Sequence, residues 1–93
     1  MTAAPAQRDA LVEILLDGVT AMPGCLSYIV ATDPEDDNAI WITEVWDSKE
    51  SHEGSLLLPS VKEAISKAMP LIAGFEKGTV TNPVGGHGLN THS

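Results

Sequence analysis

The chain has 93 residues, which is room for one domain with a modest hydrophobic core. Hydrophobic residues make up 43% of it, too many for a disordered protein, and no apolar run approaches the ~20 residues of a membrane-spanning helix. A net charge of −8, with no cluster of basic residues, repels polyanions and excludes nucleic acid as a partner.

The first predicted element is a helix between Pro5 and Pro23. Its apolar residues recur at steps of three and four and form one stripe, namely Leu11, Ile14, Leu15, Val19 and Met22. Pro5 suits the entry to a helix, and Pro23 with the glycine after it suits the end. Residues 1–5 lack the basic start and apolar block of a secretory signal, so we expect a cytoplasmic protein.

Two strands are predicted next, over residues 25–32 and 39–46, and an acidic turn region joins them over residues 33–38. This order predicts an antiparallel hairpin. Alternation separates two faces of the second strand: Ile40, Ile42, Glu44 and Trp46 on one, and Trp41, Thr43 and Val45 on the other. Because both faces are largely apolar, we expect both to be covered, one of them by helices.

Two helices and a last strand complete the pattern. Asp47 is placed to cap a short polar helix of residues 48–57, with Glu50 in the reciprocal position of a capping box. Pro59 suits the first turn of a further helix, whose apolar stripe is Val61, Ala64, Ile65 and Ala68. Residues 76–81 are the candidate for the last strand.

With the two adjoining helices counted as one helical segment, the resulting order is helix, strand, strand, helix, strand, in a single domain of residues 1–84 with a tail over residues 85–93. It predicts an α+β protein with a ferredoxin-like antiparallel sheet and helices on one face, except that the first strand of that fold is missing. The absence of this central strand leaves its neighbours with unpaired backbone groups, at about 1–3 kcal/mol for each buried group. We therefore expect a true start upstream of Met1. The alternatives are direct pairing of the flanking strands and a strand donated by another subunit.

Several short motifs then occur in register: Pro23-Gly24-Cys25-Leu26-x-Tyr28, Glu44-x-Trp46-Asp47-Ser48-Lys49-Glu50, Pro59-x-Val61, Pro70-Leu71-Ile72, and the closing residues 83–89. Together, over about residues 6–89, they resemble the antibiotic biosynthesis monooxygenase family, and within it the small quinol monooxygenases. The resemblance implies a homodimer whose two sheets pack face to face, forming a dimeric α/β barrel. We assign Trp41 to that dimer interface.

The resemblance also implies an activity, that of a monooxygenase without a cofactor, acting with molecular oxygen on a quinol-like or polycyclic phenolic substrate. Such a substrate reduces oxygen directly once it is deprotonated, so the protein has to supply an apolar cavity, a proton-handling group and an aromatic surface. The alternatives are a non-catalytic protein of the same fold that binds a small ligand, and a truncated, inactive relative. The haem-degrading branch is a poorer match, because Ser55 or Leu56 stands where a helix histidine is usual.

Four residues are the candidates for the site. His52 is the candidate proton-handling residue, since histidine titrates near neutrality, and the alternative is an exposed helix histidine. Trp46, the second catalytic candidate, supplies a flat wall or is a plain core aromatic. Glu44, a candidate for substrate binding, needs a partner or a raised pKa on an apolar face, and a structural salt bridge or hydrogen bond is the alternative. Tyr28 donates a hydrogen bond to the substrate or is structural.

We predict no metal site. Cys25 is the single cysteine, and His87 and His92 lie in the tail without regular spacing, which does not match the ligand sets of metal centres.

Overall fold

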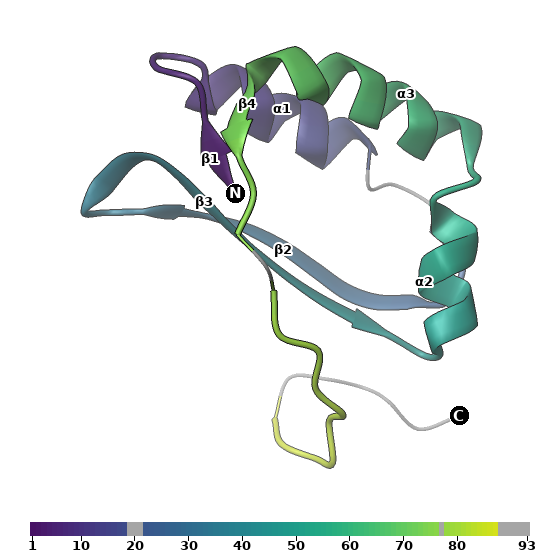
Figure 1. Cartoon of the computed structure of the whole chain (residues 1–93). Coiled ribbons are helices and arrows are strands. Elements are labelled where there is room, and N and C mark those ends of the chain that lie inside the picture. Colours follow the sequence, from purple (N-terminus) through teal and green to yellow (C-terminus); the bar gives the residue numbers. More distant parts are fainter. Residues whose placement is uncertain (19–21, 77, 88–93) are drawn as a thin grey trace.

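The structure is a computed structural model that describes residues 1–18, 22–76 and 78–87. Its elements, in chain order, are β1 (Thr2–Ala3), α1 (Arg8–Gly18), β2 (Cys25–Asp33), β3 (Asp36–Trp46), α2 (Lys49–Ser55), α3 (Pro59–Ala68), the 3-10 turn η1 (Met69–Leu71) and β4 (Ile72–Gly74). The strands form one antiparallel sheet in the order β2-β3-β1-β4. Figure 1 shows α1 and α3 side by side over one face of it, with α2 beside the end of the hairpin, so the α+β ferredoxin-like prediction is confirmed.

None of the helices within the described residues is both long enough and apolar enough to cross a membrane.

The β2–β3 hairpin closes more tightly than the sequence pattern predicts. Asp33 pairs with Asp36, so only Pro34 and Glu35 lie between the strands, where a longer acidic loop was expected. The amide of Glu35 donates to Oδ1 of Asp33 at 2.9 Å, the side-chain hydrogen bond that makes Asp a good turn residue. From α1, Arg8 donates its Nη1 to the carbonyl of Asp36 at 2.8 Å, which ties the tip of the hairpin to the helix layer.

The position of the first strand, between β3 and β4, is occupied, so the prediction that this strand is missing is wrong. Thr2 of β1 lies opposite Ala39 of β3 and Gly74 of β4. Ahead of β1, Met1 donates its amino group to the carbonyl of Ile40 at 2.9 Å and accepts from the amide of Ile40 at 2.9 Å. A strand of two residues is too short to show an alternating pattern, which is why the sequence does not reveal it.

Two other boundaries also differ from the prediction. The last strand is β4, not residues 76–81, whose described part has no regular secondary structure. β4 follows the apolar residues of η1 without a polar break, so the sequence does not show where the helical turn ends and the strand begins. The cap of α2 is Ser48 rather than Asp47, since the amide of Ser51 donates to Oγ of Ser48 at 3.1 Å.

Within the described residues, the fully buried hydrophobic core is small. It consists of one side chain each from β1, α1, β3 and α3, namely Ala3, Leu11, Ile40 and Ala68. Ile14 and Leu15 of the predicted α1 stripe are half-buried and pack against this cluster, whereas Val19 lies outside the described residues. The core therefore lies where β1 meets β3, away from the end of the hairpin at which α2 begins.

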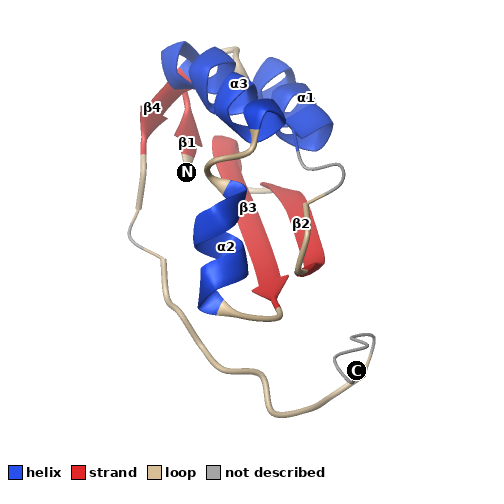
Figure 2. Cartoon of the chain, turned by 90° about the vertical axis from the view of Figure 1, so that its right-hand side faces the viewer, coloured by secondary structure: helices blue, strands red, loops and turns tan. Residues whose placement is uncertain are grey.

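No helix in the part of the chain that the structure describes covers the face of the hairpin that points away from α1 and α3 (Figure 2). Ile29 and Trp41 are both exposed, and alternation along the strands places them on this face. Trp41 donates its Nε1 to Oδ2 of Asp33 at 3.0 Å. That hydrogen bond is also the main reason why the pKa of Asp33 is lowered.

Gly24 allows α2 to pack against the start of β2. Its φ of +81° lies in the region that side chains disfavour, and its carbonyl accepts a hydrogen bond from the amide of Asp47 at 2.8 Å. A Cβ at this position would overlap the side chains of Ser51 and Asp47, so a larger residue has to displace the start of α2.

We expect Gly24→Ala to destabilise the protein by about 1–2 kcal/mol through backbone strain alone, with a further loss from the displaced helix. The matched control is Gly54→Ala within α2, where a Cβ meets nothing within 4 Å. This control should be neutral or stabilising by up to about 1 kcal/mol. Chemical denaturation followed by circular dichroism measures both, and equal stability of the two variants would contradict the role of Gly24.

Candidate functional site

A cavity of about 220 Å³ lies between the sheet and the helices. Alternate residues of β3 share one face, so Ile42, Glu44 and Trp46 all reach it from the sheet. Most of the remaining wall is apolar and comes from the helices, for example Leu15 of α1 and Ile65 of α3. The cavity is therefore largely hydrophobic, with polar groups at few positions.

All four residues selected from the sequence line this cavity. Tyr28 lies directly opposite Glu44 across the β2–β3 pairing. Trp46 follows two residues further along β3 on the same face, and His52 reaches the cavity from α2. The structure thus brings Tyr28, Glu44, Trp46 and His52 together, whereas the chemical role of each residue stays a prediction.

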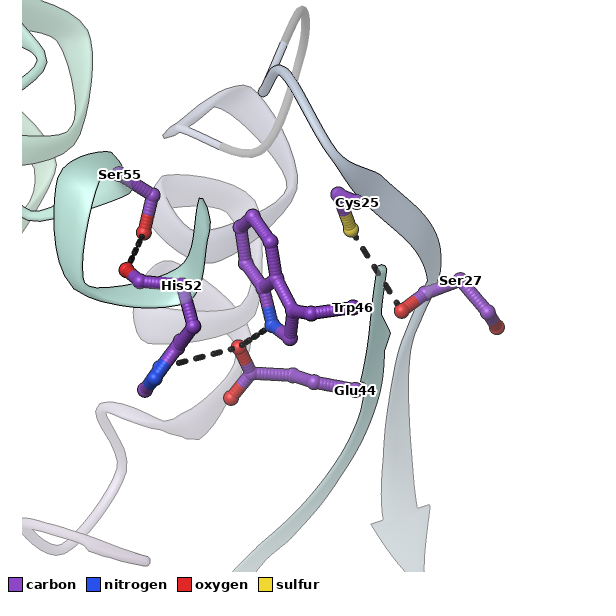
Figure 3. A network of polar contacts seen from close by, with 6 residues as sticks. All are labelled: Cys25, Ser27, Glu44, Trp46, His52 and Ser55. Carbon is purple, nitrogen blue, oxygen red and sulfur yellow. Dashed lines mark hydrogen bonds and ion pairs between the residues drawn. The ribbon is translucent and has the colours of Figure 1, made fainter. Parts of the chain in front are cut away.

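The carboxylate of Glu44 links the two aromatic residues. Its Oε1 accepts a hydrogen bond from Nε1 of Trp46 at 3.1 Å and lies 3.8 Å from Nε2 of His52 (Figure 3). The centroids of the indole and imidazole rings are 5.3 Å apart and the rings are inclined by 56°. The side chains of His52 and Glu44 are 46% and 33% exposed, so a ligand can reach both. The arrangement places a potential proton acceptor, the imidazole of His52, beside a carboxylate and a flat ring.

Ser55 is a site residue that the sequence analysis did not select. It is buried, lines the cavity, and donates its Oγ to the carbonyl of His52 at 2.6 Å, which holds the last turn of α2 together. The large apolar side chains of Leu56, Met69 and Phe75 also line the cavity without having been selected. In the sequence, the one sign of this apolar wall is the run of leucines over residues 56–58, at the end of a polar helix.

Other potential ligands and nucleophiles lie apart from this arrangement. Among the described residues, no group of three or more His, Cys, Asp or Glu side chains could hold a metal ion, and His92 lies outside those residues. Burial raises the pKa of Cys25, whose Sγ donates to the carbonyl of Ser27 at 3.5 Å (Figure 3). The thiol therefore stays protonated and weakly nucleophilic near neutral pH.

The phenol of Tyr28 is kept neutral by its surroundings. Burial, and then the negative charge of Glu44 on the neighbouring strand, raises the pKa of Tyr28 to about 12. A neutral phenol keeps its proton, so Tyr28 is able to donate a hydrogen bond to an oxygen atom in the cavity.

Tyr28 is the only tyrosine, so the ultraviolet absorbance of the phenolate reports on it alone. We expect a titration midpoint of about 12 in the folded protein and about 10 in denaturant. Between these values the unfolded state binds fewer protons than the folded state. The contribution of Tyr28 to stability is therefore complete below about pH 10 and is lost as the pH rises through about 12.

Glu44→Gln removes the neighbouring charge and should lower the folded-state midpoint of Tyr28, with Glu63→Gln on the exposed side of α3 as the control. A midpoint near the ordinary value in wild type, while circular dichroism shows the fold intact, would contradict the burial of this phenol.

Comparisons with known proteins agree with the geometry. The family model described as antibiotic biosynthesis monooxygenase matches residues 1–67. No curated protein matches the chain. The chain is also similar to the crystal structure of a putative antibiotic biosynthesis monooxygenase from Chloroflexus aurantiacus J-10-fl. The two are 61% identical over 97% of this chain and 92% of that one, with a TM-score of 0.93. The resemblance based on the sequence motifs is thereby confirmed, and the chain belongs to the antibiotic biosynthesis monooxygenase family.

Proposed function

We propose that this protein is a monooxygenase that needs no bound cofactor and oxidises a quinol-like or polycyclic phenolic substrate with molecular oxygen. The observation that carries the proposal is the meeting of His52, Glu44 and Trp46 in an otherwise apolar cavity. A base, a charge that stabilises its protonated form and a flat aromatic surface are what such a reaction requires. Family membership supports the monooxygenase class.

In the proposed mechanism, His52 is the general base. Its Nε2 takes a proton from the bound substrate, and the carboxylate of Glu44, 3.8 Å away, stabilises the imidazolium that forms. Trp46 donates its N–H to the same carboxylate, which fixes the indole as a surface for a flat ring. The neutral phenol of Tyr28 donates a hydrogen bond to the substrate oxyanion.

All electrons for the reduction of oxygen come from the substrate. The deprotonated substrate transfers one electron to oxygen, and the resulting radical and superoxide couple to form a carbon–oxygen bond. The peroxide takes back the proton held by His52. Its oxygen–oxygen bond then breaks while the remaining hydrogen on the oxygenated carbon leaves as a proton, and the released hydroxide takes up that proton and departs as water. One oxygen atom remains in the product as a carbonyl, and the other leaves in water.

We expect His52→Ala to lower kcat for oxygen uptake by a factor of about 10²–10⁴, the usual contribution of general acid–base catalysis. His87→Ala, in the exposed segment after the sheet, is the matched control and should have wild-type activity. An oxygen electrode with reduced quinones and anthrones, with and without a metal chelator, provides the measurement. Wild-type activity in His52→Ala would remove this residue from the mechanism. Saturable ligand binding by wild type without oxygen uptake would favour the non-catalytic ligand-binding alternative.

We also propose that the protein is a homodimer in which a second copy covers the open face of the hairpin. The support is the pair of large apolar side chains on that face, Ile29 and Trp41, since adjoining exposed apolar groups mark an interaction surface. The hydrogen bond from Trp41 to Asp33 holds the indole in one orientation on this face.

Trp41→Glu should convert the dimer into a monomer, because it places a charge in the centre of the proposed interface. Leu16→Glu is the control, since Leu16 is 52% exposed and Trp41 is 60% exposed, but Leu16 lies on α1. Sedimentation equilibrium gives the molecular mass of each variant. A Trp41→Glu protein with the same mass as wild type would overturn the proposed interface.

A further inference from the structure

The ionisable side chains of the cavity are gathered in one part of its wall. Among the described lining residues, the ionisable side chains are Tyr28, Glu44 and His52, and they lie together where Trp46 ends β3. Ile42 lies two residues before Glu44, about 6.5 Å along the strand, and apart from Ser55 the other side chains of the wall are apolar. A ligand that fits both parts has hydroxyl groups at one end and hydrocarbon at the other.

Four large apolar side chains line the cavity and are nevertheless exposed to solvent. Their exposed fractions are 47% for Leu56, 44% for Ile65, 54% for Met69 and 64% for Phe75. A side chain that borders a cavity and also faces solvent lies at its mouth. We call these four residues the apolar rim.

The size of the cavity limits what it can enclose. Its volume of about 220 Å³ is below the ~300–1,000 Å³ of typical ligand pockets. A cavity of this size suits a single ring with its hydroxyl groups better than several fused rings. Any further part of a ligand has to pass through the mouth and lie against the apolar rim.

We propose that the substrate is an amphipathic single-ring quinol, with its ring beside Glu44 and His52 and an apolar side chain that extends over the apolar rim. The proposal rests on the proposed function for the chemistry of the ring, whereas binding of the side chain is independent of turnover. The aliphatic side chains of Leu56, Ile65 and Met69 adapt to a flexible hydrocarbon chain. Covering them removes apolar surface from water, which favours a ligand that carries such a chain.

Binding of a series of 4-alkylphenols with chains of increasing length, which are poor reductants of oxygen, tests this proposal. Isothermal titration calorimetry should show Kd falling about fourfold for each methylene that becomes buried. The same chain lengths in alkylhydroquinones should lower KM for oxygen uptake and leave kcat unchanged.

Leu56→Ser and Met69→Ser should reduce the gain in affinity per methylene by a larger factor than they weaken the binding of unsubstituted phenol. Leu57→Ser is the matched control: Leu57 is the next residue in the chain, is 71% exposed, and does not line the cavity. Circular dichroism verifies that each variant is folded.

A Kd independent of chain length would overturn the proposal, as would equal effects of Leu56→Ser and Leu57→Ser. The proposal would also be overturned if the two rim variants altered the molecular mass of the assembly without altering the gain in affinity per methylene. The rim would then be a subunit interface. Binding that strengthens with chain length in a protein that takes up no oxygen would support binding of the alkyl chain at the apolar rim, and it would refute the proposed monooxygenase activity.

Discussion

The antiparallel register of β2 and β3 decides which side chains reach the cavity. Val30 lies opposite Ile42 and Tyr28 lies opposite Glu44, and alternation turns both pairs toward the helices. A shift of β3 by one residue relative to β2 would move Ile42 and Glu44 to the open face and carry Trp41 into the cavity. The tight turn at one end of the hairpin and the capped start of α2 at the other hold the register, so the site depends in part on a turn at the opposite end of the hairpin.

The contact between Glu44 and His52 matters for orientation rather than for stability. At the exposure of these side chains, such an ion pair contributes at most about 1 kcal/mol, and less when salt screens it. The same carboxylate also accepts from the indole of Trp46, so one group positions a potential base and a flat ring on two different elements. The small core beside β1 supplies the stability on which this arrangement rests.

Periodicity predicted the strand part of the site and could not predict the rest. Glu44 and Trp46 share a face because they are two residues apart on one strand, which a sequence shows directly. Met69 is the first residue of η1 and Phe75 follows β4, so no pattern within the strands or helices links these two residues to the cavity. The two-residue β1 was missed for a different reason, since its position is fixed by pairing with both neighbours and not by any pattern of its own.

The shortness of β1 makes the two halves of β3 unequal. β1 pairs with β3 at Ala39 and Met1 adds hydrogen bonds at Ile40, whereas β2 pairs with β3 as far as Trp46. Beyond Ile40, no strand within the described residues supports β3 on the side away from β2. Backbone held on one side opens at a lower free energy than backbone held on both, so amide hydrogens there exchange with solvent sooner. The wall that carries Glu44 is thus held through β2, whereas the part of β3 beside the core is held from both sides.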